Sequence, residues 1–312
     1  MSLFPLHIQT PLLTSVELSK KSGKSIYLKC ENLQPTGTFK IRGLGKLCQE
    51  LYSQGKTQLV SSSGGNAGYS VAYAGKKLGI PVTVFVPETT HQLFLDALLR
   101  LDAKVKVIGK VWDEANQAAL EFNEKIQGGF VPPFDHPTIW SGHASLVAEL
   151  HQQMSVQPDL IILAVGGGGL LCGVAEGLHQ VGWQSTSILA VEPVEAAGFK
   201  ASVEAGKVLT LSSVNTIATS LAAKRVTSKA LEWSKKHRIV NAVYDDTTTL
   251  RACLSFADDA RMLVEPACGM ALVPVYASHE VLAEFNHIVV IVCGGLGVSM
   301  ALLNNWQSKL GM

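Results

Sequence analysis

Short β-branched, apolar segments alternate with longer helical segments along most of this chain, and this alternation limits the folds open to it. Strands separated by helices of this length cannot pair as hairpins, so they form parallel sheets covered by helices on both faces. The sequence therefore predicts an α/β fold with mostly parallel, twisted sheets flanked by helices. The predicted strands are residues 26–30, 58–61, 82–86, 105–108, 160–165, 187–191 and 287–293, and the clearest helices are residues 67–78, 91–101, 111–126 and 141–154.

Length and charge narrow the class of protein further. The chain has 312 residues, 47% of them hydrophobic, so it exceeds one domain of about 150 residues and can bury two cores with a cleft between them. Its net charge is +1 and only 16% of its residues are charged, so no basic surface for nucleic acid or a membrane is expected. The apolar runs at residues 160–175 and 288–303 contain glycines and are shorter than the ~18 residues of a membrane span.

The cysteines indicate a reducing compartment. Six cysteines are widely scattered, with no C-x-x-C pair, and the N-terminal residues lack the pattern of a signal peptide. Free thiols in a cytoplasmic protein are the expectation.

Two loops that follow predicted strands have the composition of anion sites. Ligands of open α/β sheets bind at the carboxyl ends of strands. In "LVSSSGGNAGYS", small residues precede a helix near Ala67, which fits either an anion site or an ordinary strand-to-helix turn. In "LIILAVGGGGLLCG", four glycines precede a helix that begins near Leu170, and their backbone can approach a phosphate closely. The spacing matches neither G-x-G-x-x-G nor the P-loop.

A lysine and a cysteine complete a possible cofactor site. In "ENLQPTGTFKIRG", Lys40 follows a turn and lies between apolar neighbours, where desolvation would lower its pKa and favour attack on a carbonyl. Cys293 ends a predicted strand and can face a ligand or simply fill the core. A nucleophilic lysine, a phosphate-binding loop and a neutral group at a strand end are what pyridoxal phosphate requires. A solvated surface charge is the alternative for Lys40.

Six segments together resemble one enzyme family. They are "KCENLQPTGTFKIRG", "SSSGGNAG", "VPPFDHPTIWSGHASLV", "AVGGGGLLCGV", "RMLVEPACGMAL" and "VIVCGG". In this order they are similar to the L-serine dehydratase/L-threonine deaminase family of fold-type II pyridoxal-phosphate enzymes, the class with the tryptophan synthase β-like fold. The likeness is closest to the serine dehydratase and serine dehydratase-like branch. It implies a large discontinuous domain of residues 1–37 and 138–312, a small domain of residues 38–137 and a homodimer.

The resemblance assigns roles to the cofactor site. It places Lys40 at the Schiff-base position and Phe39 beside the cofactor ring. It places Asn66 at the ring hydroxyl and Cys293 at the pyridine nitrogen. The phosphate loop is implied to be Gly166, Gly167, Gly168, Gly169 and Leu170. The substrate carboxylate is implied to bind Ser63, Gly64 and Asn66, with Ser63 also placed to handle a proton near the β-hydroxyl.

A monovalent cation such as K+ is implied as well, at Glu192 and the carbonyl groups of Gly166, Ala196, Leu221 and Ala223. Two departures from the family pattern affect these assignments. Gly198 replaces a serine that is usual near the cation. Gly64 stands where many relatives have alanine, and we expect it to leave a methyl-sized gap that weakens activity, because a misplacement of ~1 Å can lower a rate about a hundredfold.

The resemblance implies elimination of water from L-serine or L-threonine, which yields pyruvate or 2-oxobutanoate and ammonia. A thiol at Cys293 fits elimination better than a carboxylate would, because it is a weak partner for a ring nitrogen. The alternatives are a serine racemase that uses Ser63, a β-replacement enzyme like cysteine synthase, and a weakly active protein that binds pyridoxal phosphate. No C-terminal regulatory domain is expected, and His136 and His143 are expected to be structural.

Overall fold

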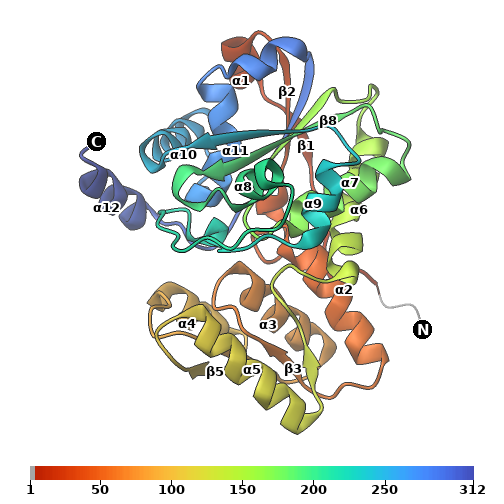
Figure 1. The fold of residues 1–312 in the computed structure, drawn as a ribbon, viewed down its shortest axis with the longest axis vertical. Coiled ribbons are helices and arrows are strands. Elements are labelled where there is room, and N and C mark those ends of the chain that lie inside the picture. Colours follow the sequence, from red (N-terminus) through yellow and green to blue (C-terminus); the bar gives the residue numbers. More distant parts are fainter. Residues whose placement is uncertain (1–3) are drawn as a thin grey trace.

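The computed structural model describes residues 4–312 and contains two separate parallel sheets, in the upper and lower parts of Figure 1. The six-stranded sheet has the order β1 (Leu12–Thr14), β2 (Ser25–Lys29), β10 (His287–Ile291), β7 (Leu160–Ala164), β8 (Ser187–Pro193) and β9 (Ile239–Tyr244). All its neighbours are parallel except β1, which runs antiparallel to β2. The four-stranded sheet is all parallel, in the order β5 (Lys104–Val107), β4 (Val82–Val86), β3 (Leu59–Ser61) and β6 (Gly129–Phe130).

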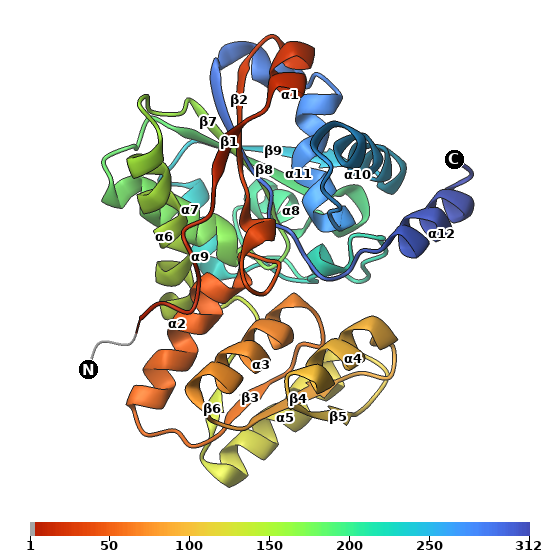
Figure 2. The same ribbon diagram turned by 180° about the vertical axis from the view of Figure 1, so that it is seen from behind.

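The helices cover both sheets, and Figure 2 shows the same layers from behind. Around the four-stranded sheet lie α2 (Lys40–Ser53), α3 (Asn66–Leu78), α4 (Gln92–Arg100) and α5 (Trp112–Ile126). The remaining helices are α1 (Val16–Ser22), α6 (Pro137–Gln153), α7 (Gly169–Gln180), α8 (Gly198–Ala205), α9 (Ser228–Ser234), α10 (Asp246–Ala260), α11 (Pro266–Tyr276) and α12 (Met300–Leu310). Short 3₁₀ turns are η1 (Glu31–Leu33), η2 (Val194–Ala196), η3 (Thr219–Leu221) and η4 (Glu280–Glu284). Within residues 4–312, none of the helices combines the length and the apolar character needed to cross a bilayer.

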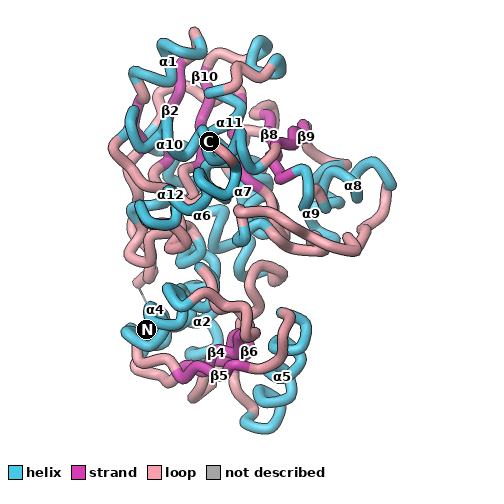
Figure 3. Tube along the Cα trace, turned by 90° about the vertical axis from the view of Figure 1, so that its left-hand side faces the viewer, coloured by secondary structure: helices cyan, strands magenta, loops and turns pink. Residues whose placement is uncertain are grey.

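The predicted α/β class with mostly parallel sheets is confirmed. All seven predicted strands are present, while β1, β6 and β9 were not predicted. Each sheet has its own core of buried aliphatic side chains, and the strands form two groups in the side view of Figure 3. The proposed domain boundaries at residues 37/38 and 137/138 stay a prediction, which limited proteolysis would test.

A buried ion network joins α2 to the six-stranded sheet. The Arg42 guanidinium donates to Glu31 at 2.6 and 2.7 Å and to Glu149 of α6 at 2.6 and 2.8 Å. Lys29 of β2 donates to the same Glu149 carboxylate at 2.6 Å. The charges of the two cations and the two carboxylates therefore balance one another. The network holds the first turn of α2 in place through Arg42, two residues after Lys40.

Candidate active site

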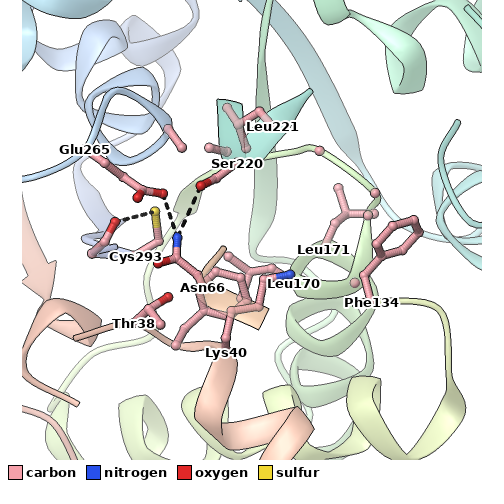
Figure 4. A pocket seen from close by; sticks show the side chains of 18 residues that line it. Thr38, Lys40, Asn66, Phe134, Leu170, Leu171, Ser220, Leu221, Glu265 and Cys293 are labelled. Atoms are coloured by element: carbon pink, nitrogen blue, oxygen red, sulfur yellow. Dashed lines mark hydrogen bonds between the residues drawn. The ribbon is translucent and has the colours of Figure 1, made fainter. Parts of the chain in front are cut away.

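One pocket between the two sheets gathers most of the residues predicted for the cofactor. Its lining includes Phe39, Lys40, Asn66, Gly166, Gly167, Gly168, Gly169, Leu170, Leu221 and Cys293 (Figure 4). Thr38, Phe134, Ser220 and Glu265 also line it, and the sequence did not single them out. The residues come from loops of both sheets, because the strands present their carboxyl ends to the space between them.

Lys40 is the first residue of α2 and lies in the pocket wall. A tight turn precedes it, in which the Gly37 N–H donates to the Gln34 carbonyl at 2.7 Å and Gly37 adopts φ 68°. The Lys40 ammonium donates to the Pro133 carbonyl at 3.0 Å. Burial lowers the pKa of Lys40 to about 8, and the nearby acidic groups of Cys293 and Glu265 oppose this shift only in part. A substantial fraction of this amine is therefore neutral near neutral pH and can act as a nucleophile or a base.

The four-glycine loop connects β7 to α7 and leaves room for no side chain. A Cβ on Gly167 would lie 2.5 Å from the Phe134 ring, and one on Gly166 would lie 3.0 Å from the Leu221 Cα. Gly168 adopts φ 89°, a left-handed conformation that glycine favours. The first N–H groups of α7 point toward the pocket end of the helix, where the helix dipole also attracts an anion. The loop therefore fits a phosphate group.

Asn66 and Glu265 meet across the pocket. Asn66 is the first residue of α3, and its Nδ2 donates to the Glu265 carboxylate at 2.9 Å and to the Ser220 hydroxyl at 3.2 Å (Figure 4). Its Oδ1 accepts from the Leu296 N–H at 2.9 Å. Glu265 is the functional residue that the sequence reasoning missed. A lone acidic residue directly before a proline in an apolar segment was the available signal.

Cys293 lies two residues after the end of β10 and remains a neutral thiol. A hydrogen bond with the Cys268 thiol, together with burial and the Glu265 charge, raises the pKa of Cys293 well above its ordinary value. The residue is 7% exposed and lines the pocket rather than only the core. It can therefore offer a ligand a weak, uncharged partner.

Ser63 and Gly64 lie outside the pocket lining, on the β3–α3 loop that leads to Asn66. The prediction of a methyl-sized gap beside Gly64 is wrong. A Cβ there would lie 2.7 Å from the Thr90 Cγ2 and 2.8 Å from the Val86 Cγ1, so these two side chains already fill the space. The sequence could not show this, because Thr90 belongs to a different loop.

The acid predicted for a cation site has two backbone hydrogen-bond donors. Glu192 ends β8 inside the core, and its carboxylate accepts from the Phe199 and Lys200 N–H groups at 2.7 and 2.8 Å, at the start of α8. Burial raises the pKa of Glu192 to about 7. Gly166 and Leu221 are close neighbours, since a Cβ on Gly166 would lie 3.0 Å from the Leu221 Cα. Between residues 4 and 312, no group of three or more His, Cys, Asp or Glu side chains forms a metal site.

The two histidines have structural contacts. His136 begins α6, and its Nδ1 accepts from the Thr138 N–H at 3.1 Å. His143 is buried edge-on against Phe39, with ring centroids 4.9 Å apart. Burial holds the pKa of His143 well below its ordinary value, so the ring is neutral.

A buried amine, a phosphate-sized glycine loop at a helix N-terminus and a neutral thiol, set between two parallel sheets, define the class of fold-type II pyridoxal-phosphate enzymes. The chain belongs to the family described as "Pyridoxal-phosphate dependent enzyme", whose model matches residues 3–294. It is 47% identical to human serine dehydratase-like, over 98% of this chain and 96% of that protein. It is 43% identical to bovine L-serine dehydratase/L-threonine deaminase, over 100% of this chain and 98% of that protein.

A solved structure has nearly the same fold. The crystal structure of an L-serine ammonia-lyase from the fungus Rhizomucor miehei superposes with a TM-score of 0.93 at 36% identity, over 97% of this chain and 99% of that one. The resemblance inferred from the sequence motifs is therefore confirmed.

Proposed function

We propose that this protein is a pyridoxal-phosphate-dependent ammonia-lyase that eliminates water from L-serine, L-threonine or both. The products are pyruvate or 2-oxobutanoate, together with ammonia. The observation that carries the proposal is the buried amine of Lys40, in one pocket with the glycine loop and Cys293. The names of the human, bovine and fungal relatives support the substrate class.

The cofactor supplies an electron sink for the charge that develops at Cα. The chain supplies the rest. The amine of Lys40, with its pKa lowered to about 8 by burial, accepts the α-proton of the bound amino acid. Gly166 to Gly169 and Leu170 would hold the phosphate through backbone N–H groups, and Phe39 would pack beside the ring.

The substrate end of the site is proposed to be the β3–α3 loop. Backbone and side-chain groups of Ser63, Gly64 and Asn66 hold the carboxylate, and the Ser63 hydroxyl donates a proton to the departing β-hydroxyl. Cys293 would offer the ring nitrogen a neutral partner, which would keep the electron sink weak and favour loss of the leaving group.

One assay tests the proposal. Purified holoenzyme is mixed with L-serine, L-threonine and their D-forms, with and without K+, and 2-oxo acid and ammonia are measured together. We expect both products from an L-form, and none from Lys40→Ala. The proposal fails if the cofactor-loaded protein releases no 2-oxo acid. Formation of D-serine would then indicate a racemase, and cysteine from O-acetylserine plus sulfide would indicate a β-replacement enzyme.

Three finer properties are part of the proposal. K+ stimulation in the assay would support a cation site at Glu192 and the carbonyl groups of Gly166, Ala196, Leu221 and Ala223. The six cysteines are all free thiols, which supports a cytoplasmic location. A homodimer follows from the resemblance alone, and sedimentation analysis of the holoenzyme tests it.

A further inference from the structure

Glu265 occupies a helix-capping position without capping its helix. It precedes Pro266 at the start of α11, yet its carboxylate makes no hydrogen bond to the first N–H groups of that helix. Instead the carboxylate turns into the pocket, where one oxygen accepts from the Asn66 Nδ2 at 2.9 Å and the other from the Gly297 N–H at 3.1 Å. The Ser220 hydroxyl accepts a second hydrogen bond from the same Asn66 amide at 3.2 Å. The orientation of the Glu265 carboxylate is therefore explained by its partners in the pocket and not by capping of α11.

The carboxylate lacks the partner that buried acids usually have. Glu265 is 3% exposed and forms no ion pair with any residue in the described part of the chain. A buried carboxylate without a cation costs stability, and burial accordingly raises the pKa of Glu265. The nearest opposing charge is the Lys40 amine. Stability alone therefore gives no reason for an acid at this position.

The carboxylate joins segments from both sides of the pocket. Asn66 belongs to the helix that follows β3 in the four-stranded sheet, and Gly297 belongs to the loop that follows β10 in the six-stranded sheet. That loop folds directly against the acid, because Gly295 adopts φ 128° and a Cβ there would lie 2.0 Å from the Glu265 carboxyl carbon. The loop begins at Cys293, so one carboxylate fixes the two segments that carry Asn66 and Cys293.

We propose that Glu265 is a positioning residue for the cofactor ring, which holds the Asn66 amide and the loop after Cys293 at a fixed separation. The inference rests on the proposed cofactor roles of Asn66 and Cys293, but not on the substrate. Of the two hydrogen bonds that the Asn66 amide donates, the one to the Ser220 hydroxyl is the longer, at 3.2 Å against 2.9 Å to Glu265. A cofactor hydroxyl that accepts from Asn66 would take the place of the Ser220 hydroxyl, and Asn66 would keep its shorter bond to Glu265.

The test is a double-mutant cycle on cofactor affinity in the cofactor-free protein. Pyridoxal phosphate is titrated into wild type, Glu265→Gln, Asn66→Ala and the double variant, and binding is followed by quenching of protein fluorescence. Glutamine keeps the volume but sets an amide N–H against the Gly297 N–H. Because hydrogen bonds to a charged group are strong, we expect each single variant to weaken binding about 10- to 100-fold. The double variant should be no more than about threefold weaker than the weaker single one.

Asp159→Asn is the matched control. The Asp159 carboxylate accepts from the Asn286 and His287 N–H groups at 2.8 Å, at the opposite end of β10. This control should lower the melting temperature and leave the affinity for pyridoxal phosphate within about twofold of wild type, because it loosens the same strand far from the pocket.

Three results would overturn the inference: wild-type affinity in Glu265→Gln, losses that multiply in the double variant, or an equal loss in Asp159→Asn. If Glu265→Gln does not fold, Glu265→Asp carries the test, because it keeps the charge but its shorter side chain cannot reach both partners; wild-type affinity there refutes the inference equally. Coupled losses of affinity in a protein that releases no 2-oxo acid would sink the proposed function and leave the role of Glu265 intact.

Discussion

The pKa of Lys40 leads to a quantitative prediction about how the cofactor-free protein captures pyridoxal phosphate. Burial lowers that pKa from 10.5 to about 8. At pH 7.5 about a quarter of the amine is then neutral, against about 0.1% for an ordinary lysine, which is a gain of roughly 200-fold. Only the neutral amine attacks a carbonyl, so the rate of capture should rise with pH and level off above a midpoint near pH 8.

Rapid mixing measures this rate from the absorbance change of the cofactor between pH 6 and pH 10. Butylamine mixed with pyridoxal phosphate over the same range corrects for the titration of the cofactor itself, and Lys40→Ala shows the background. A midpoint near that of butylamine would mean that the Lys40 amine is solvated. The structural argument for a desolvated nucleophile would then be wrong.

The same experiment tests the electrostatic partner of Lys40. The Glu265 charge raises the pKa of Lys40 and so favours the ammonium form. Glu265→Gln removes that charge, and the midpoint should move to lower pH. A midpoint that stays in place, or moves to higher pH, would show that the carboxylate is already neutral in the cofactor-free pocket.

Three further predictions follow from individual contacts. Gly64→Ala should lower the free energy of unfolding by about 1–3 kcal/mol, because the added methyl group overpacks the space beside Thr90. Adding Thr90→Ala should recover most of this loss, as measured by urea titration. A Gly64→Ala variant as stable as wild type would contradict the close contact with Thr90. Cys293→Asp should lower the ratio of 2-oxo acid release to deuterium exchange at Cα, while Cys293→Ser should leave it nearly unchanged; an unaltered ratio in the aspartate variant would make the thiol a packing group only. Glu149→Gln should cost about 3–5 kcal/mol of unfolding free energy, because Arg42 then loses a buried charge partner, and a loss under 1 kcal/mol would show that water reaches the network.

The sequence predicted all the inner strands of both sheets and the edge strand β5, and it missed the other three edge strands, β1, β6 and β9. The strand β6 has only two residues, Gly129 and Phe130, so no periodicity can reveal it. The strand β1 has three residues and lies at the edge of its sheet. By contrast, β9 reads "IVNAVY", which is rich in β-branched residues, so its signal was present in the sequence.

The residues of the candidate site also divide into those that local sequence could predict and those that depend on distant segments. Motif order sufficed for Lys40, Asn66 and the glycine loop, because each stands at the end of a strand or the start of a helix, where local sequence fixes its place. The surroundings of Gly64 could not be predicted, since they depend on how Thr90 of another loop packs. Glu265 was missed for a related reason: its partners Asn66 and Gly297 come from distant segments.

The carboxylate of Glu265 also gives a physical basis for the neutral thiol that the sequence argument required. Its charge opposes ionisation of Cys293 and adds to the effects of the Cys268 hydrogen bond and of burial. The same charge favours the ammonium form of Lys40 and so limits how far burial can lower that pKa. One buried acid therefore acts on both functional groups in the same sense, favouring the protonated form of each, while burial leaves the amine only partly protonated near neutral pH. A base that releases its proton readily, beside a ring partner that carries no charge, is the combination that elimination of a β-hydroxyl group requires.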